Sequence, residues 1–182
     1  MGMAAPLYYT AEMVRALPED GHRYETVHGE LLVTPAPRVL DQVVVERLRD
    51  ALGNYLAHHP EWQLLAAPAD ISWTSDVLVQ PDLFVVPIAE VRTLDWARLR
   101  HLDLVVEVLS PTTARADRFT KRRLYQDMQV PAYWIVDADE HYMEIWTPEA
   151  SLPGVACDRV EWRPAGAADS FVLSVPELFR PL

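Results

Sequence analysis

Two acidic residues stand alone in two apolar segments of the chain, 25 positions apart. Asp82 lies within residues 80–86 and Glu107 lies within residues 104–111. Each segment is short and rich in β-branched residues, which predicts a buried strand. A lone carboxylate inside such a strand is costly unless a positive charge meets it. A divalent metal ion would supply that charge, so the pattern indicates a metal site.

A third acid and a lysine follow shortly after the Glu107 segment. Asp117 and Lys121 stand four positions apart at the start of a helical pattern whose apolar stripe continues through Leu124 and Tyr125. Because Lys121 shares that stripe, we expect its ammonium to point toward the core edge near Glu107. Asp, Glu and Lys gathered on neighbouring core elements are typical of a magnesium-dependent phosphodiesterase.

The two strand acids also have plainer interpretations. By strand phase, Glu107 shares a face with Asp103, so its segment could be a strand with one half-polar face. Asp82 follows Pro81, which places it near a strand start or edge, where a solvated Asp is unremarkable. Two such carboxylates are nevertheless a normal ligand set for one Mg²⁺, which keeps several of its waters.

The helical residues have plainer interpretations too. Asp117 and Lys121 could form an exposed pair that contributes a few tenths of a kcal/mol, although the apolar stripe argues against this. Arg118 and Arg122 lie off the stripe, and for them we prefer a solvated basic face.

Other catalytic chemistries find little support in the sequence. The six His residues show no zinc-ligand spacing. The six Gly residues form no phosphate-binding loop, and the Gly-x-Ser-x-Gly pattern of serine esterases is absent. The sequence therefore argues against loop-type nucleotide hydrolases and serine esterases.

Length and charge bound the remaining possibilities. With 182 residues, half of them hydrophobic, we expect one domain over residues 1–182. The net charge of −11 argues against loose binding to a polyanion, so any nucleic-acid contact must be local. Basic residues gather once, on the segment that carries Asp117: Arg115, Arg118, Lys121, Arg122 and Arg123.

Several observations bear on the compartment. A single cysteine, Cys157, excludes an intrachain disulfide framework and fits a reducing environment. Residues 1–6 do not resemble a secretion signal, and no apolar run is long enough to span a bilayer. We therefore expect a cytoplasmic protein without membrane contact.

The rest of the pattern predicts the elements that position these residues. Before Asp82 we expect a short helix at 11–16 capped by Thr10, a hairpin of strands 24–27 and 30–34, a long helix at about 39–59, and strands at 62–66 and 70–73. After it we expect a helical excursion at 90–100, a helix to about 128, strands at 132–137, 142–146, 159–162 and 171–173, and a short helix near Glu177.

Five ordered blocks of the sequence resemble one known family. They are Arg23-Tyr24-Glu25 with Gly29-Glu30-Leu31, residues 80–83, residues 105–111, Asp117 and Lys121 with Tyr125, and residues 130–137. Together they resemble the Uma-two family of putative restriction endonucleases, a branch of the PD-(D/E)XK nuclease superfamily. The resemblance spans nearly the whole chain. It implies an α/β (α+β) restriction-endonuclease-like fold, in which helices flank a central mixed sheet.

The resemblance also assigns expected roles. Asp82 and Glu107 look like the metal-binding acids, with Mg²⁺ as the ion and Mn²⁺ as its substitute. Lys121 stands in for the motif lysine, which in the superfamily usually lies two residues after the Glu, where this chain has Leu109. Glu30 is expected as a fourth acidic member of the catalytic set. At the start of the long helix, Asp41 occupies a position where the family commonly has His.

The resulting hypothesis is metal-dependent hydrolysis of phosphodiester bonds in DNA. The alternative is a catalytically inactive oligomeric or nucleic-acid-binding module that keeps the fold. Six Trp residues and several apolar strands are more than one small sheet needs, so we expect a homodimer. Because Lys121 contributes charge rather than apolar area, Lys121→Ala is expected to abolish cleavage and to change stability little.

Overall fold

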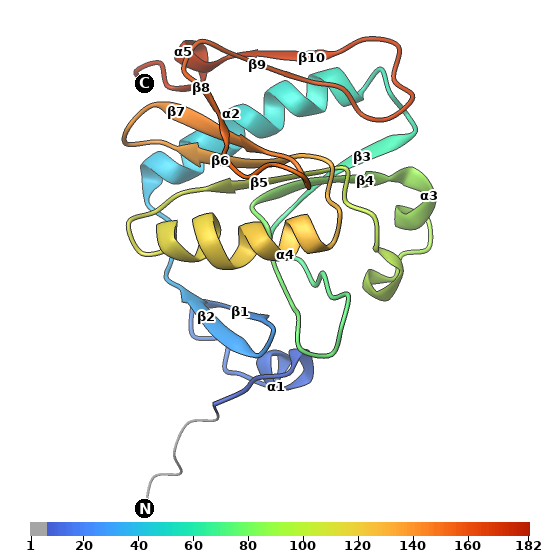
Figure 1. The fold of residues 1–182 in the computed structure, drawn as a ribbon, viewed down its shortest axis with the longest axis vertical. Coiled ribbons are helices and arrows are strands. Elements are labelled where there is room, and N and C mark those ends of the chain that lie inside the picture. The colour runs from blue at the N-terminus through green and yellow to red at the C-terminus, as the bar shows by residue number, and fades with distance from the viewer. Residues whose placement is uncertain (1–6) are drawn as a thin grey trace, which may run out of the picture.

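The structure is a computed structural model that describes residues 7–182 (Figure 1). Residues 1–6, on which the prediction of no secretion signal partly depends, lie outside the described residues. Within residues 7–182, none of the helices combines the length and apolar character that crossing a bilayer requires.

A six-stranded mixed sheet forms the centre of the fold, as the sequence predicts. Its strand order is β3-β4-β5-β6-β7-β8, in which only β5 and β6 pair in parallel. The strands are β3 (Trp62–Ala66), β4 (Leu83–Pro87), β5 (Leu104–Val108), β6 (Tyr133–Asp137), β7 (Tyr142–Trp146) and β8 (Gly154–Ala156).

Helices cover the two faces of this sheet (Figure 1). The long helix α2 (Val39–Leu56) packs on one face, and the connection from β5 to β6 runs over the other as η2 (Ala116–Lys121) and α4 (Arg122–Asp127). Parallel neighbours require such a crossover. Because side chains alternate along β5, Val106 joins the core under α2, whereas Val105 joins the core under α4.

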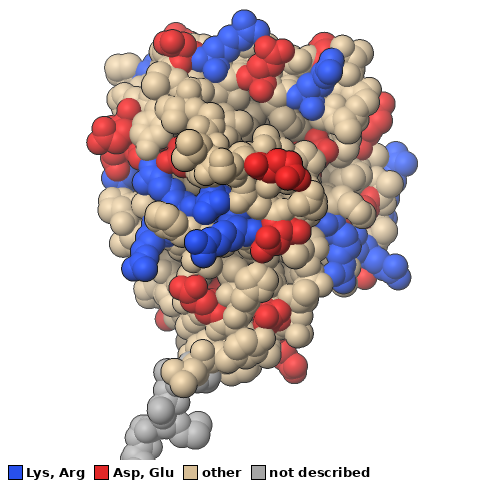
Figure 2. Space-filling model, viewed as in Figure 1, with Lys and Arg blue, Asp and Glu red and all other residues tan. Residues whose placement is uncertain are grey.

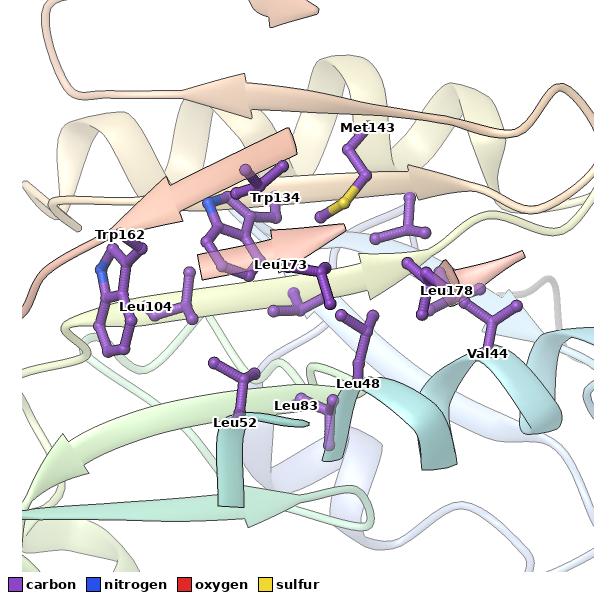
Figure 3. Close-up of a cluster of buried hydrophobic side chains, with 14 of the residues drawn as sticks. Val44, Leu48, Leu52, Leu83, Leu104, Trp134, Met143, Trp162, Leu173 and Leu178 are labelled. Atoms are coloured by element: carbon purple, nitrogen blue, oxygen red, sulfur yellow. The ribbon is translucent and has the colours of Figure 1, made fainter. Parts of the chain in front are cut away.

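The α2 face is closed by the C-terminal part of the chain. There β9 (Arg159–Trp162) and β10 (Phe171–Ser174) form a separate hairpin, followed by α5 (Val175–Leu178). Figure 3 shows side chains of α2, the sheet and this C-terminal part meeting in one apolar cluster, with Leu48, Trp134 and Trp162 among them. This part of the molecule supplies a rigid apolar base for the sheet.

An N-terminal hairpin lies on the side of the sheet that η2 and α4 cover. Its strands β1 (Arg23–Val27) and β2 (Glu30–Thr34) pair only with each other, and one bridge, Thr26 to Leu78, ties them to the rest. The turn residues His28 and Gly29 have φ of 50° and 83°, as a tight hairpin requires. The preceding α1 (Ala11–Arg15) is capped by Thr10, as predicted.

Some elements differ from the sequence predictions. The prediction of a strand at 70–73 is wrong. Within this segment only Ile71 makes a β-bridge. The Trp73 indole donates to the Arg100 carbonyl, and the Arg100 guanidinium donates to the Trp73 carbonyl. The excursion at 90–100 divides into α3 (Ile88–Val91) and η1 (Trp96–Arg98). Strand β8 was not predicted, since its three residues carry no alternating pattern.

Candidate active site

A cleft of 720 Å³ opens at the end of the sheet where β4 begins and β5 finishes. It is bordered by the N-terminal hairpin, the start of α2 and the segment at 110–113 that leads into η2. Asp82, Glu107 and Asp117 all line this cleft. Three of the acids singled out in the sequence are therefore brought to one cavity.

Strand pairing brings Asp82 next to Glu107. Strands β4 and β5 are antiparallel neighbours with Leu83 opposite Val106, so Asp82, just before β4, falls beside Glu107. The amide of Val108 donates a hydrogen bond of 2.8 Å to Asp82 Oδ2. The two strands are sheet neighbours with both carboxylates at the same end, as the sequence predicts.

Lys121 reaches this end of the sheet from the helix. Its Nζ donates to Glu107 Oε1 at 3.0 Å and lies 2.8 Å from Glu25 Oε2 and 3.4 Å from Asp117 Oδ1. The side chain is only 2% exposed. The ammonium is thus enclosed by three carboxylates, and the plainer interpretation of an exposed helical pair is wrong.

The helix that carries Asp117 and Lys121 is locally widened. Ala116–Lys121 is a π-helical turn, in which the Arg122 amide donates to the Asp117 carbonyl five residues earlier. Asp117 and Lys121, four residues apart on this turn, are both buried and face the sheet. The period of the sequence predicts an ordinary helix and gives no sign of this turn.

Glu25 is a member of the cluster that the sequence prediction missed. Its side chain is fully buried, and its Oε1 accepts a hydrogen bond of 2.7 Å from the amide of Gln80. Glu25 shares a strand face with Val27, and that phase was the available signal. Glu30 instead lies exposed at the turn end of the hairpin, where it pairs with Val27, so the structure does not bring it into the cluster.

Arg23 is the second cation at the site. Its Nη1 donates to Asp82 Oδ1 at 2.8 Å and to the Gln80 carbonyl at 3.0 Å. Burial opposes its charge, but the carboxylates of Asp82, Glu107 and Glu25 outweigh burial, so the pKa of Arg23 is raised. Arg23 therefore stays charged and holds Asp82 in place.

The buried groups titrate far from their ordinary values. Burial raises the pKa of Glu107 well above its usual value, although Lys121 opposes the rise. Burial likewise raises the pKa of Asp117. For Lys121, burial lowers the pKa, but the surrounding carboxylates raise it by more, so the pKa of Lys121 lies well above its usual value. The lysine therefore remains an ammonium, and of the nearby carboxyls Glu107 and Asp117 have raised pKa values.

Tyr125 completes the surroundings of Glu107. Its hydroxyl donates to Glu107 Oε1 at 3.4 Å, and burial raises its pKa well above the usual value. It therefore remains a neutral donor. Its ring packs against Tyr133, whose hydroxyl donates to the Asp117 carbonyl at 3.0 Å and so fixes the π-helical turn.

The cluster carries more negative than positive groups. Four carboxylates, those of Glu25, Asp82, Glu107 and Asp117, face two cations, Lys121 and Arg23. Two buried oxygens, Glu25 Oε2 and Asp117 Oδ1, accept no hydrogen bond within residues 7–182. With all four carboxyls ionised, the cluster would carry two negative charges in excess, the charge that one divalent cation neutralises, so further positive charge would favour the ionised forms of Glu107 and Asp117.

The donor set suits a magnesium ion better than a fully protein-coordinated metal. Within the described part of the chain, no three His, Cys, Asp or Glu side chains are grouped closely enough to hold a metal by themselves. Mg²⁺ needs only one or two carboxylates and retains waters, for which the cleft has room. Asp82 and Glu107 meet that requirement, since each Asp82 oxygen accepts a single hydrogen bond and the two donors to Glu107 both bond Oε1, which leaves lone pairs on both carboxylates.

Two basic residues near the site, Arg118 and Arg122, make contacts within the fold. Arg118 is not simply solvated, because it donates to Glu144 Oε1 at 2.7 Å and to Asp137 Oδ2 at 3.0 Å. The guanidinium of Arg122 lies 4.7 Å from the centre of the Trp146 ring. The preference for a solvated face at Arg118 and Arg122 was therefore wrong.

Asp41, at the position where the resemblance leads one to expect His, has a structural partner. It is buried in the first turn of α2, where Arg38 donates to its Oδ1 at 2.7 Å. Arg38 also pairs with Asp139 at 3.0 Å. Asp41 lines the cleft but is already committed to this ion pair.

Two comparisons with known proteins found a match, one to a family and one to a solved structure. Residues 11–175 match the model of the Uma2 family, described as "Putative restriction endonuclease". The fold is similar to the crystal structure of a putative nuclease belonging to DUF820 from Anabaena variabilis, with a TM-score of 0.72 and 19% identity. That match covers 94% of this chain and 97% of the other. No curated protein matches the chain.

Proposed function

Because the chain belongs to the Uma2 family of putative restriction endonucleases, we propose that it is a metal-dependent nuclease that hydrolyses phosphodiester bonds in DNA. One observation carries the proposal beyond the family. Asp82, Glu107 and Asp117 line an open cleft, and a buried lysine, Lys121, lies 3.0 Å from Glu107 behind them. Groups so costly to bury are typical of a functional site.

Each residue has a proposed role. Asp82 and Glu107 bind the ion, Mg²⁺ by preference and Mn²⁺ as a substitute. Arg23 orients Asp82, and Lys121 stabilises charge that develops on the phosphate or orients the attacking water. Glu25 and Asp117 hold Lys121 charged and fixed. When bound, the metal ion would polarise the phosphate and lower the pKa of its water.

The test is a cleavage assay on supercoiled and linear DNA with Mg²⁺, with Mn²⁺ and with a chelator. We expect cleavage that requires the metal and that is lost in Glu107→Gln and Asp82→Asn. Asp103→Asn is the matched control, because Asp103 is a buried acid at the opposite end of β5. Metal-induced thermal stabilisation, absent in Glu107→Gln, reports binding separately from cleavage. Cleavage that survives both site variants would contradict the proposal.

The alternative is a catalytically inactive oligomeric or nucleic-acid-binding module. It predicts no metal-dependent cleavage on any DNA tested, together with nucleic-acid binding or self-association that Glu107→Gln leaves intact. The same assays distinguish the two, since only the nuclease loses a product when Glu107 is changed.

We also propose that the chain acts as one domain and as a homodimer, an arrangement suited to cutting both strands of a duplex. Among the Trp residues, Trp134 and Trp162 are buried in the core, while Trp96 is 42% exposed. Light scattering over a range of concentrations tests the dimer. A monomer at high concentration would remove this claim and leave the site untouched.

A further inference from the structure

The outer side of η2 and α4 carries an exposed aromatic residue between two arginines. Phe119 is 55% exposed, and Arg115 and Arg123 are exposed four residues before and after it. Residues four apart share a helix side, so the three form one row, which we call the Arg-Phe-Arg face. Asp117 and Lys121, each two residues from Phe119, point to the opposite side, toward the sheet.

The two arginines differ from the other basic residues of the helix. Lys121 is buried in the cluster, and Arg118 is held by Glu144 and Asp137. Within the part of the chain that the structure describes, Arg115 and Arg123 make no ion pair. Figure 2 shows basic side chains gathered where α4 crosses this side of the molecule. On a chain of net charge −11, this is a local positive site.

The face begins close to the cleft along the chain. The cleft wall includes Ser110, Thr112 and Thr113, and Arg115 follows two residues later. From Arg115 to Arg123 the row extends along the helix axis, away from the cleft, by somewhat less than the roughly 12 Å that eight residues of α-helix would span, because part of it is the π-helical turn. A polymer bound with one phosphodiester at Glu107 would therefore have its flank near these three side chains.

We propose that the Arg-Phe-Arg face holds a single-stranded flank of the nucleic-acid substrate, with the arginines on its phosphates and an unpaired base stacked on Phe119. The inference rests on the proposed nuclease function. A single exposed Phe means little by itself. Flanked by unpaired cations beside a phosphodiester site, it forms the pairing of stacking surface and charge that single strands require. In a duplex the base faces are stacked on one another, so a duplex would contact the arginines and no base would stack on Phe119.

The test compares binding to a blunt duplex and to the same duplex with a single-stranded tail. Fluorescence anisotropy is measured in chelator, so that no cleavage occurs. Phe119→Ala is expected to weaken binding of the tailed duplex about tenfold, and that of the blunt duplex less than twofold. Arg115→Glu with Arg123→Glu should also lower the salt dependence of tail binding, by roughly 0.7 in slope for each lost phosphate contact.

Matched controls come from the opposite end of the sheet. Arg92 and Arg98 are exposed, and Leu94 is 92% exposed, on the segment between β4 and β5. Arg92→Glu with Arg98→Glu changes the net charge by the same amount as the arginine pair of the face. These variants and Leu94→Ala should bind both DNAs as the wild type does.

Three results would overturn the inference. They are equal binding of tailed and blunt duplex by the wild type, tail binding unaffected by Phe119→Ala, or equal losses in the face and control variants. If Phe119→Ala instead alters self-association in light scattering and leaves DNA binding unchanged, the face is a contact between copies and the inference also fails. Failure of the nuclease proposal is read separately, from cleavage that Glu107→Gln does not reduce.

Discussion

The two faces of the central sheet bury different kinds of side chain, apolar ones on one face and charged ones among apolar ones on the other. Under α2, Leu48, Leu104 and Trp134 pack in an apolar cluster in which only shape matters (Figure 3). Under η2 and α4, the same strand β5 presents Glu107 to a buried lysine and two further carboxylates. Because successive side chains of a strand point to opposite faces, neighbouring residues of β5 lie in the two different environments.

The difference shows which face was shaped by stability. Buried ion pairs often stabilise less than apolar residues of the same volume, because desolvation offsets their attraction. The α2 face avoids that cost, whereas the α4 face accepts it beside an open cleft. We infer that the ionic face persists for chemistry, and the following predictions test this contrast.

The largest effect is expected on activity when the ionic face is changed. Glu107→Gln should lower metal-dependent cleavage on the order of a thousandfold, because it removes a proposed metal ligand. The free energy of unfolding should not fall, since a buried charge of raised pKa is replaced by a neutral amide. Cleavage rates and urea denaturation measure the two quantities. A large loss of stability with normal cleavage would reverse the assignment of the two faces.

The next effect concerns Lys121. The sequence led us to expect that Lys121→Ala changes stability little. The burial of Lys121 reverses that expectation, because in this variant three carboxylates lose their shared ammonium. The variant should lose about 3–5 kcal/mol of stability at neutral pH as well as cleavage. Lowering the pH should restore part of the stability as Glu107 and Asp117 take up protons. Lys121→Arg, which keeps the charge but not the compact shape, should fold better and still cleave poorly.

On the apolar face the expected pattern is the converse. Leu48 is fully buried under α2, so Leu48→Ala should cost about 2–5 kcal/mol of stability through a cavity. Cleavage per folded molecule should stay at the wild-type level below the unfolding transition. Thermal denaturation and cleavage assays on the same preparation test this. Loss of cleavage in the folded variant would mean that the two faces are coupled.

The smallest effect is the pH dependence of stability. The folded pKa of Asp103 is raised from 3.8 to about 6 by burial, so the folded state holds that proton more tightly than the unfolded state. The contribution of Asp103 to stability is therefore greatest below pH 3.8 and declines as pH rises through this window. The difference between the two pKa values corresponds to at most about 3 kcal/mol, and Asp103→Asn should remove about 2 kcal/mol of decline, because solvent screens a carboxyl that is only partly desolvated.

Glu107 contributes a decline of the same sign from pH 4.5 upward, and Glu107→Gln should remove it. Metal binding should instead tighten as pH rises, because ligands must lose their protons. Denaturation and metal titration across the pH range would reveal either sign. A stability that rises through this window would contradict the role of burial.

Sequence alone predicts the parts of the site that depend on local period. The β-branched runs locate Asp82 and Glu107, and the apolar stripe directs Lys121 toward Glu107. It misses Glu25, because a carboxylate in an alternating hairpin strand usually faces water, and only packing of the hairpin against β5 buries it. It also misses the π-helical turn, which arises from tertiary contacts such as the Tyr133 hydroxyl on the Asp117 carbonyl.

The hairpin of β1 and β2 supplies two residues of the site from outside the main sheet. Within residues 7–182, the strands that carry Arg23 and Glu25 share one β-bridge with the rest of the fold, in addition to the side-chain contacts of the site, whereas Glu107 lies in the middle of the main sheet. Elements with few such connections open at lower free energy than core strands do, so amide hydrogens of the hairpin should exchange with solvent sooner than those of β5. The molecule could then lose its site while remaining folded, and the lifetime of the docked hairpin would set the fraction of molecules competent for catalysis.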